Sequence, residues 1–453
     1  MYLYPPDIVE ITVKRWKQIN SSLHPSPPFP TNDELKTILD VLYHVSFLTE
    51  ENRRIAVRIV YIPQKDFKNQ LPSYMNNHDL PIPFLQPIRF NVSEVLRLAP
   101  ALEPTVSAIA ICSTKEIESS LVDSPLAIWG IFNQGAEWWK LLTGRKTAAL
   151  APPNVLTIST FAPGFISAST SGSVLFRLRA GNLLNMPLKD LNKGHIGNFL
   201  NEAAEALYRQ TCQAIERKRY DSDIDSDNHP QNQYFRTLTN IVNLTRERGH
   251  GGSFIIFSND ISANDQRLED RVTIKYPLNS PDIWKELIKE AEANWHYFRL
   301  LFPKRKSKKW ESLTDSADAS IKDLQSMISW ENTQNNSQQK IAEFEQFVSS
   351  LSGVDGAVVL TNRLKVLGFG AEITATSPSL KVVRIADTPD AKTYSEKQID
   401  SYGTRHRSAL RLCSSFEHLM CIVISQDGFI RAMKRIGPNV YMWNDVSLSD
   451  ECL

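Results

Sequence analysis

Cysteine is scarce in this sequence, and no motif built on it is present. The five cysteines are odd in number and scattered, and none lies in a Cys-x-x-Cys pair or a Cys/His cluster with zinc-ligand spacing. A disulfide framework and a structural zinc site are therefore excluded. We expect the reduced, mostly buried thiols of a cytoplasmic protein.

Long apolar runs and net charge are also absent. Runs such as VSAIAIC (106–112) are too short to cross a bilayer, and the N-terminus lacks the basic start and apolar stretch of a signal peptide. The 51 Lys and Arg nearly balance the 50 Asp and Glu, giving a formal net charge of +1. Nothing in this balance directs the chain to a membrane or to nucleic acid, although a local basic pocket is compatible with it.

The length of 453 residues exceeds one ordinary core and favours two domains. Residues 1–185 are strand-rich, because short runs of Val, Ile and aromatic residues alternate with turn residues after a helix expected over 32–48. Residues 190–453 instead alternate helices and strands, which is typical of a layered α/β domain. The expected fold class is therefore α/β, α+β overall, with a mainly antiparallel N-terminal sheet.

Two polar stretches of the C-terminal half are expected to be loops. The run KRKSKK (304–309) has no basic groove with interleaved aromatics around it, so a solvated loop is favoured over a nucleic-acid patch. The run ENTQNNSQQK (331–340) is of low complexity and predicts a polar loop before a helix over 341–351.

Three short motifs in the C-terminal half carry chemistry. In DGAVVL, Asp355 precedes a buried strand, and Gly356 allows a close backbone approach to a ligand. In GTRHRSALRL, Thr404 is expected to cap a helix with basic residues in its first turn. Basic residues are unfavourable there because a helix N-terminus attracts anions, so two arginines beside free backbone N–H groups predict a phosphate site. In ISQDG, Asp427 follows a buried strand, where ligand sites of α/β folds collect.

Each motif alone has a plain alternative. Asp-Gly is a common turn, and a basic helix start can simply face solvent. Together, two carboxylates and a pair of guanidinium groups are the groups that metal-assisted phosphoryl chemistry on a nucleotide requires.

The joint set DGAVVL, GTRHRSA and ISQDG resembles the diadenylate cyclase domain, which includes the nucleotide-binding domain of DNA-integrity-scanning proteins. GHGGSFIIFS (249–258) resembles an early strand of the same domain. The resemblance places this domain at about 190–453, with an insertion at about 280–335. In the N-terminal half, YHVSFLTEENRR and LAIWGIF resemble a sensor module called DACNV.

The resemblance implies that two ATP molecules, one in each of two facing protomers, are condensed to cyclic di-AMP and pyrophosphate with Mg²⁺ or Mn²⁺. It implies that Asp355 binds the metal and orients the 3′-hydroxyl, and that Asp427 is the second metal ligand. Ser425 is expected at the distal phosphates. The implied catalytic set is Asp355, Arg405, His406 and Arg407, and the implied nucleotide contacts are Gly356, Ala357, Gly403, Thr404, Arg405, His406, Arg407 and Ser425.

Two departures from the family pattern leave the function open. The family's Ser-Glu-Glu is here Ser425-Gln426-Asp427, and its Leu-Pro-Leu-Ser stretch is replaced by GFGAEITATSPS with an extra acid, Glu372. One hypothesis is a cyclase regulated by its N-terminal domain. Another is a weak or inactive sensor that binds ATP or a cyclic nucleotide. A nucleic-acid module is not favoured by the near-neutral charge.

Overall fold

The computed structural model describes residues 2–21, 26–50, 53–64, 80–103, 106–117, 124–133, 154–170, 173–183, 194–216, 228–258, 261–262, 265–268, 270–301, 321–377, 379–426, 429–444 and 446. The chain divides between Lys189 and Asp190 into two compact units, each with its own mixed sheet. The mixed α/β class expected from the sequence is confirmed, with a strand-rich N-terminal part and a C-terminal sheet flanked by helices.

The N-terminal unit is a sheet with helices on one face. The strands of this sheet follow the order β10-β9-β8-β7-β3-β5-β6-β4, antiparallel except for the pair β3–β5, and β1 and β2 form a separate antiparallel pair. The elements are α1 (Pro5–Asn20), α2 (Asn32–Val45), β1 (Thr49–Glu50), β2 (Arg53–Arg54), β3 (Val57–Tyr61), β4 (Leu80–Arg89), α3 (Val92–Leu98), β5 (Ser107–Ser113), β6 (Leu126–Asn133), β7 (Leu156–Thr160), β8 (Phe165–Thr170), β9 (Ser173–Arg179) and β10 (Asn182–Leu183).

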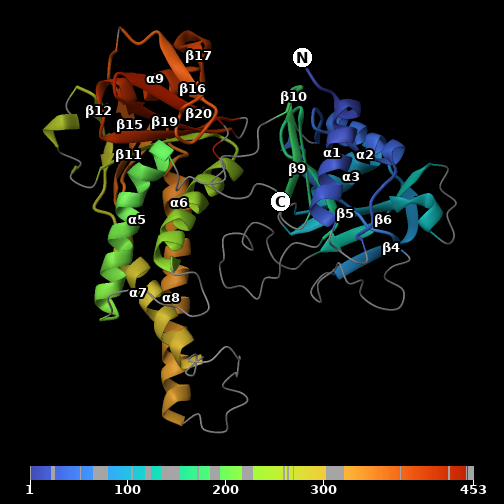
Figure 1. Ribbon diagram of the computed structural model, residues 1–453, viewed down its shortest axis with the longest axis horizontal. Coiled ribbons are helices and arrows are strands. Elements are labelled where there is room, and N and C mark those ends of the chain that lie inside the picture. The colour runs from blue at the N-terminus through green and yellow to red at the C-terminus, as the bar shows by residue number, and fades with distance from the viewer. Residues whose placement is uncertain are drawn as a thin grey trace. The chain divides into compact units, whose positions relative to one another are not determined.

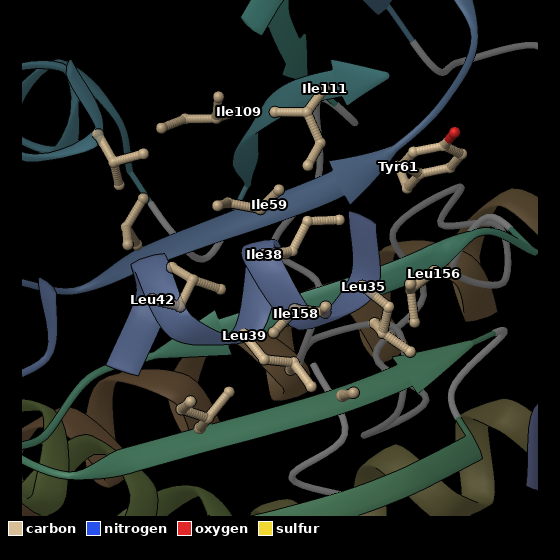
Figure 2. Close-up of a cluster of buried hydrophobic side chains, with 14 of the residues drawn as sticks. Leu35, Ile38, Leu39, Leu42, Ile59, Tyr61, Ile109, Ile111, Leu156 and Ile158 are labelled. Carbon is tan, nitrogen blue, oxygen red and sulfur yellow. The ribbon is translucent and has the colours of Figure 1, made fainter. Parts of the chain in front are cut away.

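Helix α2 shows why this unit folds as it does. Thr31 accepts a hydrogen bond from the backbone N–H of Glu34 at 3.3 Å, and the Glu34 side chain accepts one from the backbone N–H of Thr31 at 2.9 Å, which forms a capping box. The apolar residues recur at helical spacing and face alternate residues of β3, β5 and β7, as Figure 2 shows. The labelled core residues are Leu35, Ile38, Leu39, Leu42, Ile59, Tyr61, Ile109, Ile111, Leu156 and Ile158.

The C-terminal unit contains a larger sheet of order β12-β15-β14-β11-β18-β19-β20-β16-β17, with β13 paired to β15. Figure 1 shows the helices α5–α8 running from this sheet as a bundle. The elements are α5 (Gly194–Ala214), α6 (His229–Glu247), β11 (Gly252–Phe257), β12 (Val272–Thr273), β13 (Tyr276–Pro277), α7 (Ile283–Leu301), α8 (Ile321–Leu351), β14 (Ala357–Thr361), β15 (Val366–Ile373), β16 (Val382–Ala386), β17 (Tyr394–Gln398), α9 (Thr404–Ser415), β18 (Leu419–Ile424), β19 (Ile430–Ile436) and β20 (Asn439–Asn444).

The prediction of a loop over 331–340 is wrong, because α8 continues through this stretch without interruption. The helix also continues through residue 335, where the insertion was expected to end. Two polar residues of this stretch, Gln334 and Ser337, are buried and contact α7. Gln334 donates from Nε2 to Glu290 at 3.0 Å and to Asn294 at 2.8 Å, and Gln338 donates to Glu290 at 2.8 Å. His229 of α6 contacts the same carboxylate at 3.0 Å. The run KRKSKK lies outside the described residues.

Candidate functional site at one edge of the C-terminal sheet

The three motifs meet at one edge of the C-terminal sheet. Strand β11 lies between β14, to which it is parallel, and β18, to which it is antiparallel. The N-terminal ends of β11 and β14 and the C-terminal end of β18 therefore share an edge. Asp355 precedes β14 and Ser425 follows β18, so they flank the start of β11 and are separated by two strand spacings, about 10 Å.

Helix α9 brings the basic motif to the same edge. It packs on the sheet through Ala409, Leu410, Leu412 and Cys413, which leaves its N-terminus at the strand ends. The N-cap is Gly403, with φ −64° and ψ 164°, and Thr404 is the first helical residue. The prediction that Thr404 caps the helix is therefore wrong, because the helix begins one residue earlier than predicted and Thr404 already belongs to it.

Arg405 ties α9 to the start of β11. Its Nη1 lies 2.8 Å from the position that a Cβ would occupy on Gly251, and Gly251 has φ +72°. Glycine is favoured here by this backbone conformation and because a Cβ would also lie 2.7 Å from the carbonyl oxygen of Ile424. The glycine-rich turn before β11 therefore contributes to the site by allowing Arg405 to pack against it.

A pocket of about 410 Å³ opens at this edge. Its walls come from the segment before α9, the first turn of α9, the end of β18 and the start of β19. The described lining residues include no carboxylate; they are Ser401, Tyr402, Gly403, Thr404, Arg405, His406, Ser425, Gln426, Phe429 and Arg431. An anion is the ligand that such a cationic pocket favours.

His406 is a neutral base within the cationic cluster. Its side chain is buried, and Arg431 approaches its Nε2 at 2.7 Å through Nη1. Burial, together with the positive charges of Arg431 and Arg405, lowers the pKa of His406 to about 4. Since a guanidinium can only donate, Nε2 must accept this hydrogen bond, and the ring proton lies on Nδ1.

Ser425 has a structural partner at the pocket. Its hydroxyl accepts a hydrogen bond from the backbone N–H of Phe429 at 3.1 Å, and its own backbone N–H donates to the Phe429 carbonyl at 2.8 Å. These two bonds close the turn between β18 and β19. Asp427, the predicted second metal ligand, lies outside the described residues.

Asp355 is at the same edge but does not line the pocket. It is exposed in the turn between α8 and β14. Gly356 has φ +112°, and a Cβ there would lie 2.5 Å from the backbone of Gly370 on β15. The close approach that Gly356 permits in the structure is to a neighbouring strand of the protein, and the expected approach to a ligand stays a prediction.

His250 lies between the two halves of the site. It precedes Gly251, against which Arg405 packs, and its Nε2 lies 3.6 Å from where a Cβ of Gly353 would be. Gly353 is two residues before Asp355, so the turn before β11 contacts both the acidic and the basic segments. The Nδ1 atom of His250 lies 2.6 Å from the carbonyl oxygen of Gly251.

The remaining predicted residues are placed as follows. Ala357 is buried as the first residue of β14, and Arg407 is half-buried on α9 and does not line the described pocket. Glu372 is exposed on β15, one residue after the partner of Ala357, and so lies near the start of β14. Gly403, Thr404, Arg405, His406 and Ser425 are brought together in the pocket.

The described residues contain no group of three or more His, Cys, Asp or Glu side chains placed to hold a metal ion. Mg²⁺ at nucleotide sites is usually held by one or two carboxylates together with substrate phosphates. The exposed Asp355 fits this kind of site, whereas it does not fit an ion enclosed by protein alone.

Sequence reasoning missed Arg431, Tyr402 and Phe429, which line the pocket. Arg431 is a single basic residue in a strand, and no spacing rule distinguishes it. Tyr402 directly precedes GTRHR, and its position before a helix that carries the basic motif was the available signal.

Comparison with known protein families gives a match in the N-terminal part of the chain. Residues 24–133 match the family described as "Probable sensor domain DACNV", a range that contains α2 and strands β3 to β6. The N-terminal part is therefore similar to a sensor domain, in agreement with the predicted sensor module. No curated protein gives a match to the chain. In the described part of the chain, no helix is long and apolar enough to span a membrane.

Proposed function

We propose that the protein is a diadenylate cyclase, and that its N-terminal sensor-like unit regulates it. One observation carries this proposal: Asp355, the GTRHR helix start and Ser425 come from separate segments and meet at one sheet edge, beside a cationic pocket of about 410 Å³. The pocket has the chemistry of a site for a polyphosphate, and the neighbouring carboxylate that of a group that binds a metal or a sugar hydroxyl.

In the proposed reaction, two protomers face each other with one ATP in each. The 3′-hydroxyl of each ATP loses its proton and attacks the α-phosphorus of the other. One new P–O bond forms and the bond to pyrophosphate breaks in each attack, so two ATP give one cyclic di-AMP and two pyrophosphates. This chemistry depends on in-line positioning and charge neutralisation.

The residues have separate roles in this proposal. Arg405 neutralises phosphate charge, a role that the resemblance also implies for Arg407 although it does not line the described pocket. Thr404 and the neutral His406 donate hydrogen bonds. Asp355 orients the attacking 3′-hydroxyl. Asp355, Asp427 and the phosphates would hold a Mg²⁺ or Mn²⁺ ion, which would supply Lewis-acid stabilisation of the phosphoryl oxygens.

A nucleotide-binding sensor without turnover is the second candidate. Gln426 supports it, because this neutral amide lines the pocket at a position where the cyclase pattern has a carboxylate. Such a protein would bind ATP or a cyclic nucleotide through the same pocket, and its binding would be independent of Asp355.

The test is to incubate the purified full-length protein with ATP and Mn²⁺ and to separate the nucleotides by chromatography. We expect cyclic di-AMP from the wild type and its loss in Asp355→Asn. Asp282→Asn is the matched control, since Asp282 is an exposed carboxylate paired with Lys285 at 3.7 Å before α7. Absence of product from the wild type, together with ATP binding, would replace the cyclase by the sensor.

A further inference from the structure

Arg431 is a cation built into the wall of the pocket by four contacts. It lies at the start of β19, is half-buried, and donates from Nη1 to His406 at 2.7 Å and from Nε to Asn444 at 3.0 Å. Its guanidinium carbon lies 5.0 Å from the centre of the Phe429 ring and 5.9 Å from that of Tyr402. Aromatic faces attract a guanidinium, so the two rings hold the group in place.

The pairing with His406 determines which group presents charge to a ligand. His406 accepts from Arg431 and stays neutral, so it adds no charge of its own to the pocket. The positive charge at this part of the wall belongs to Arg431, and Arg405 adds a second guanidinium group to the lining of the same pocket. Two guanidinium groups in one pocket match a ligand with several anionic oxygens.

Arg435 provides an internal comparison. It lies four residues along the same strand, which places it on the same face and about 14 Å away. Arg435 donates to the carbonyls of Ser414 at 3.0 Å and Gly437 at 2.8 Å, and so binds the C-terminal end of α9. Two arginines on one face of β19 therefore meet opposite ends of α9, and of the two Arg431 is the one that lines the pocket.

We propose that Arg431 is a phosphate ligand of this site, and that together with Arg405 it binds the pyrophosphate part of the nucleotide. This inference rests on the proposed nucleotide site and adds a residue that none of the sequence motifs contains. In the cyclase reaction, negative charge develops on the departing pyrophosphate. A fixed guanidinium at that position stabilises the charge without reorganising during the reaction.

The experiment measures the binding of inorganic pyrophosphate, and separately of ATP, to the full-length protein by calorimetry. The variants are Arg431→Met, Arg431→Lys and the control Arg435→Met, with circular dichroism to verify folding. Loss of a charge-assisted contact predicts about 10- to 100-fold weaker pyrophosphate binding in Arg431→Met. Arg431→Lys keeps the charge but loses the planar fork, so a smaller loss is expected. Arg435→Met should bind as the wild type does.

The outcomes separate this inference from the proposed activity. Pyrophosphate affinity within twofold of the wild type in both Arg431 variants overturns the role of Arg431, even if cyclic di-AMP is formed. A wild type that does not bind pyrophosphate also overturns it. If binding depends on Arg431 but no cyclic di-AMP is formed, the cyclase proposal fails and the phosphate site stands. Should Arg431→Met not fold, Arg431→Lys gives the same decision.

Discussion

The two units of the protein use arginine differently. In the N-terminal sheet, Arg58 and Arg177 lie within strands, 5% and 2% exposed. The cross-strand pairing runs Arg58–Ser159–Ser167–Arg177, and the two serine hydroxyls between them are 3.0 Å apart. In the C-terminal unit, Arg405 and Arg431 line a pocket at the sheet edge.

This difference indicates what each set of charges does. Burial lowers the pKa of Arg58 to about 9, which shows that its charge is held away from water. Such a group is part of the packed structure, and changing it should alter folding first. Arg405 is exposed at a helix start and contacts the ligand space, so changing it should alter binding and leave stability nearly intact.

Arg405→Met is the change with the largest expected effect. Removing one charge that stabilises a phosphoryl transition state is expected to lower cyclic di-AMP formation by about 100- to 1,000-fold. The free energy of unfolding should stay within about 0.5 kcal/mol, as for other surface changes. Nucleotide chromatography and urea unfolding measure the two quantities. A large loss of stability would place Arg405 with the buried arginines and break the comparison.

Glu290→Ala tests whether burial of a charged side chain, and not the unit of the protein in which it lies, decides that its removal lowers stability. The carboxylate is 1% exposed and accepts from His229, Gln334 and Gln338, and its pKa is lowered to about 2 by these partners, His229 first, against the opposing effect of burial. Removing one partner of a buried pair should cost about 3–5 kcal/mol. Chemical denaturation measures it. A cost below 1 kcal/mol would contradict this assignment of the network.

Arg177→Ala is the N-terminal counterpart of Arg405→Met. Arg177 is among the largest fully buried side chains, so its truncation removes packing in the sheet. We expect a loss of about 2–4 kcal/mol in unfolding free energy, as for other large-to-small core changes. Pyrophosphate affinity under native conditions should be unchanged. Weaker binding by a folded Arg177→Ala protein would show that the buried arginine serves the ligand.

Acidification tests the state of His406. Its folded-state pKa of about 4 is below the usual 6.5. The contribution of neutral His406 to the free energy of unfolding is therefore fully present above about pH 6.5 and is lost as the pH falls towards 4. At pH 5 this group contributes about 2 kcal/mol less than at pH 7. Glu290 loses its contribution only below about pH 4.5. Urea unfolding at both pH values should show the loss in the wild type and not in His406→Gln.

Gly403→Ala has the smallest expected effect. Among the described residues, no atom lies within 4 Å of where its Cβ would be, and its φ of −64° suits any residue. We expect an unfolding free energy near the wild type in urea. Gly251→Ala, by contrast, should lower the unfolding free energy and weaken binding, because its φ is +72° and the new Cβ would lie 2.7 Å from the carbonyl oxygen of Ile424 and 2.8 Å from Arg405. Equal unfolding free energies in the two variants would contradict this close packing at Gly251.

The regular elements were predictable where local periodicity determines them. Helix α2 and strand β18 lie where the apolar pattern placed them, because both bury that pattern. The stretch at 331–340 was not predictable, since its Gln and Ser residues look like a solvated loop. Gln334 becomes buried only because α7 supplies Glu290 and Asn294, a tertiary effect that the local sequence does not carry.

The candidate site shows the same division. The motif residues Thr404, Arg405 and His406 were identified from the sequence, and the structure brings them together. Arg431 was not identified, because its role depends on how β19 lies next to the start of α9. The neutral state of His406 is also a consequence of that contact and of burial.

The most direct test of the central claim is a calorimetric titration of the full-length protein with ATP, in parallel with Arg405→Met and Asp282→Asn. We predict saturable binding to the wild type and to Asp282→Asn, and at least tenfold weaker binding to Arg405→Met. Absence of ATP binding by the wild type, or equal affinity in all three proteins, would contradict a nucleotide site at this sheet edge.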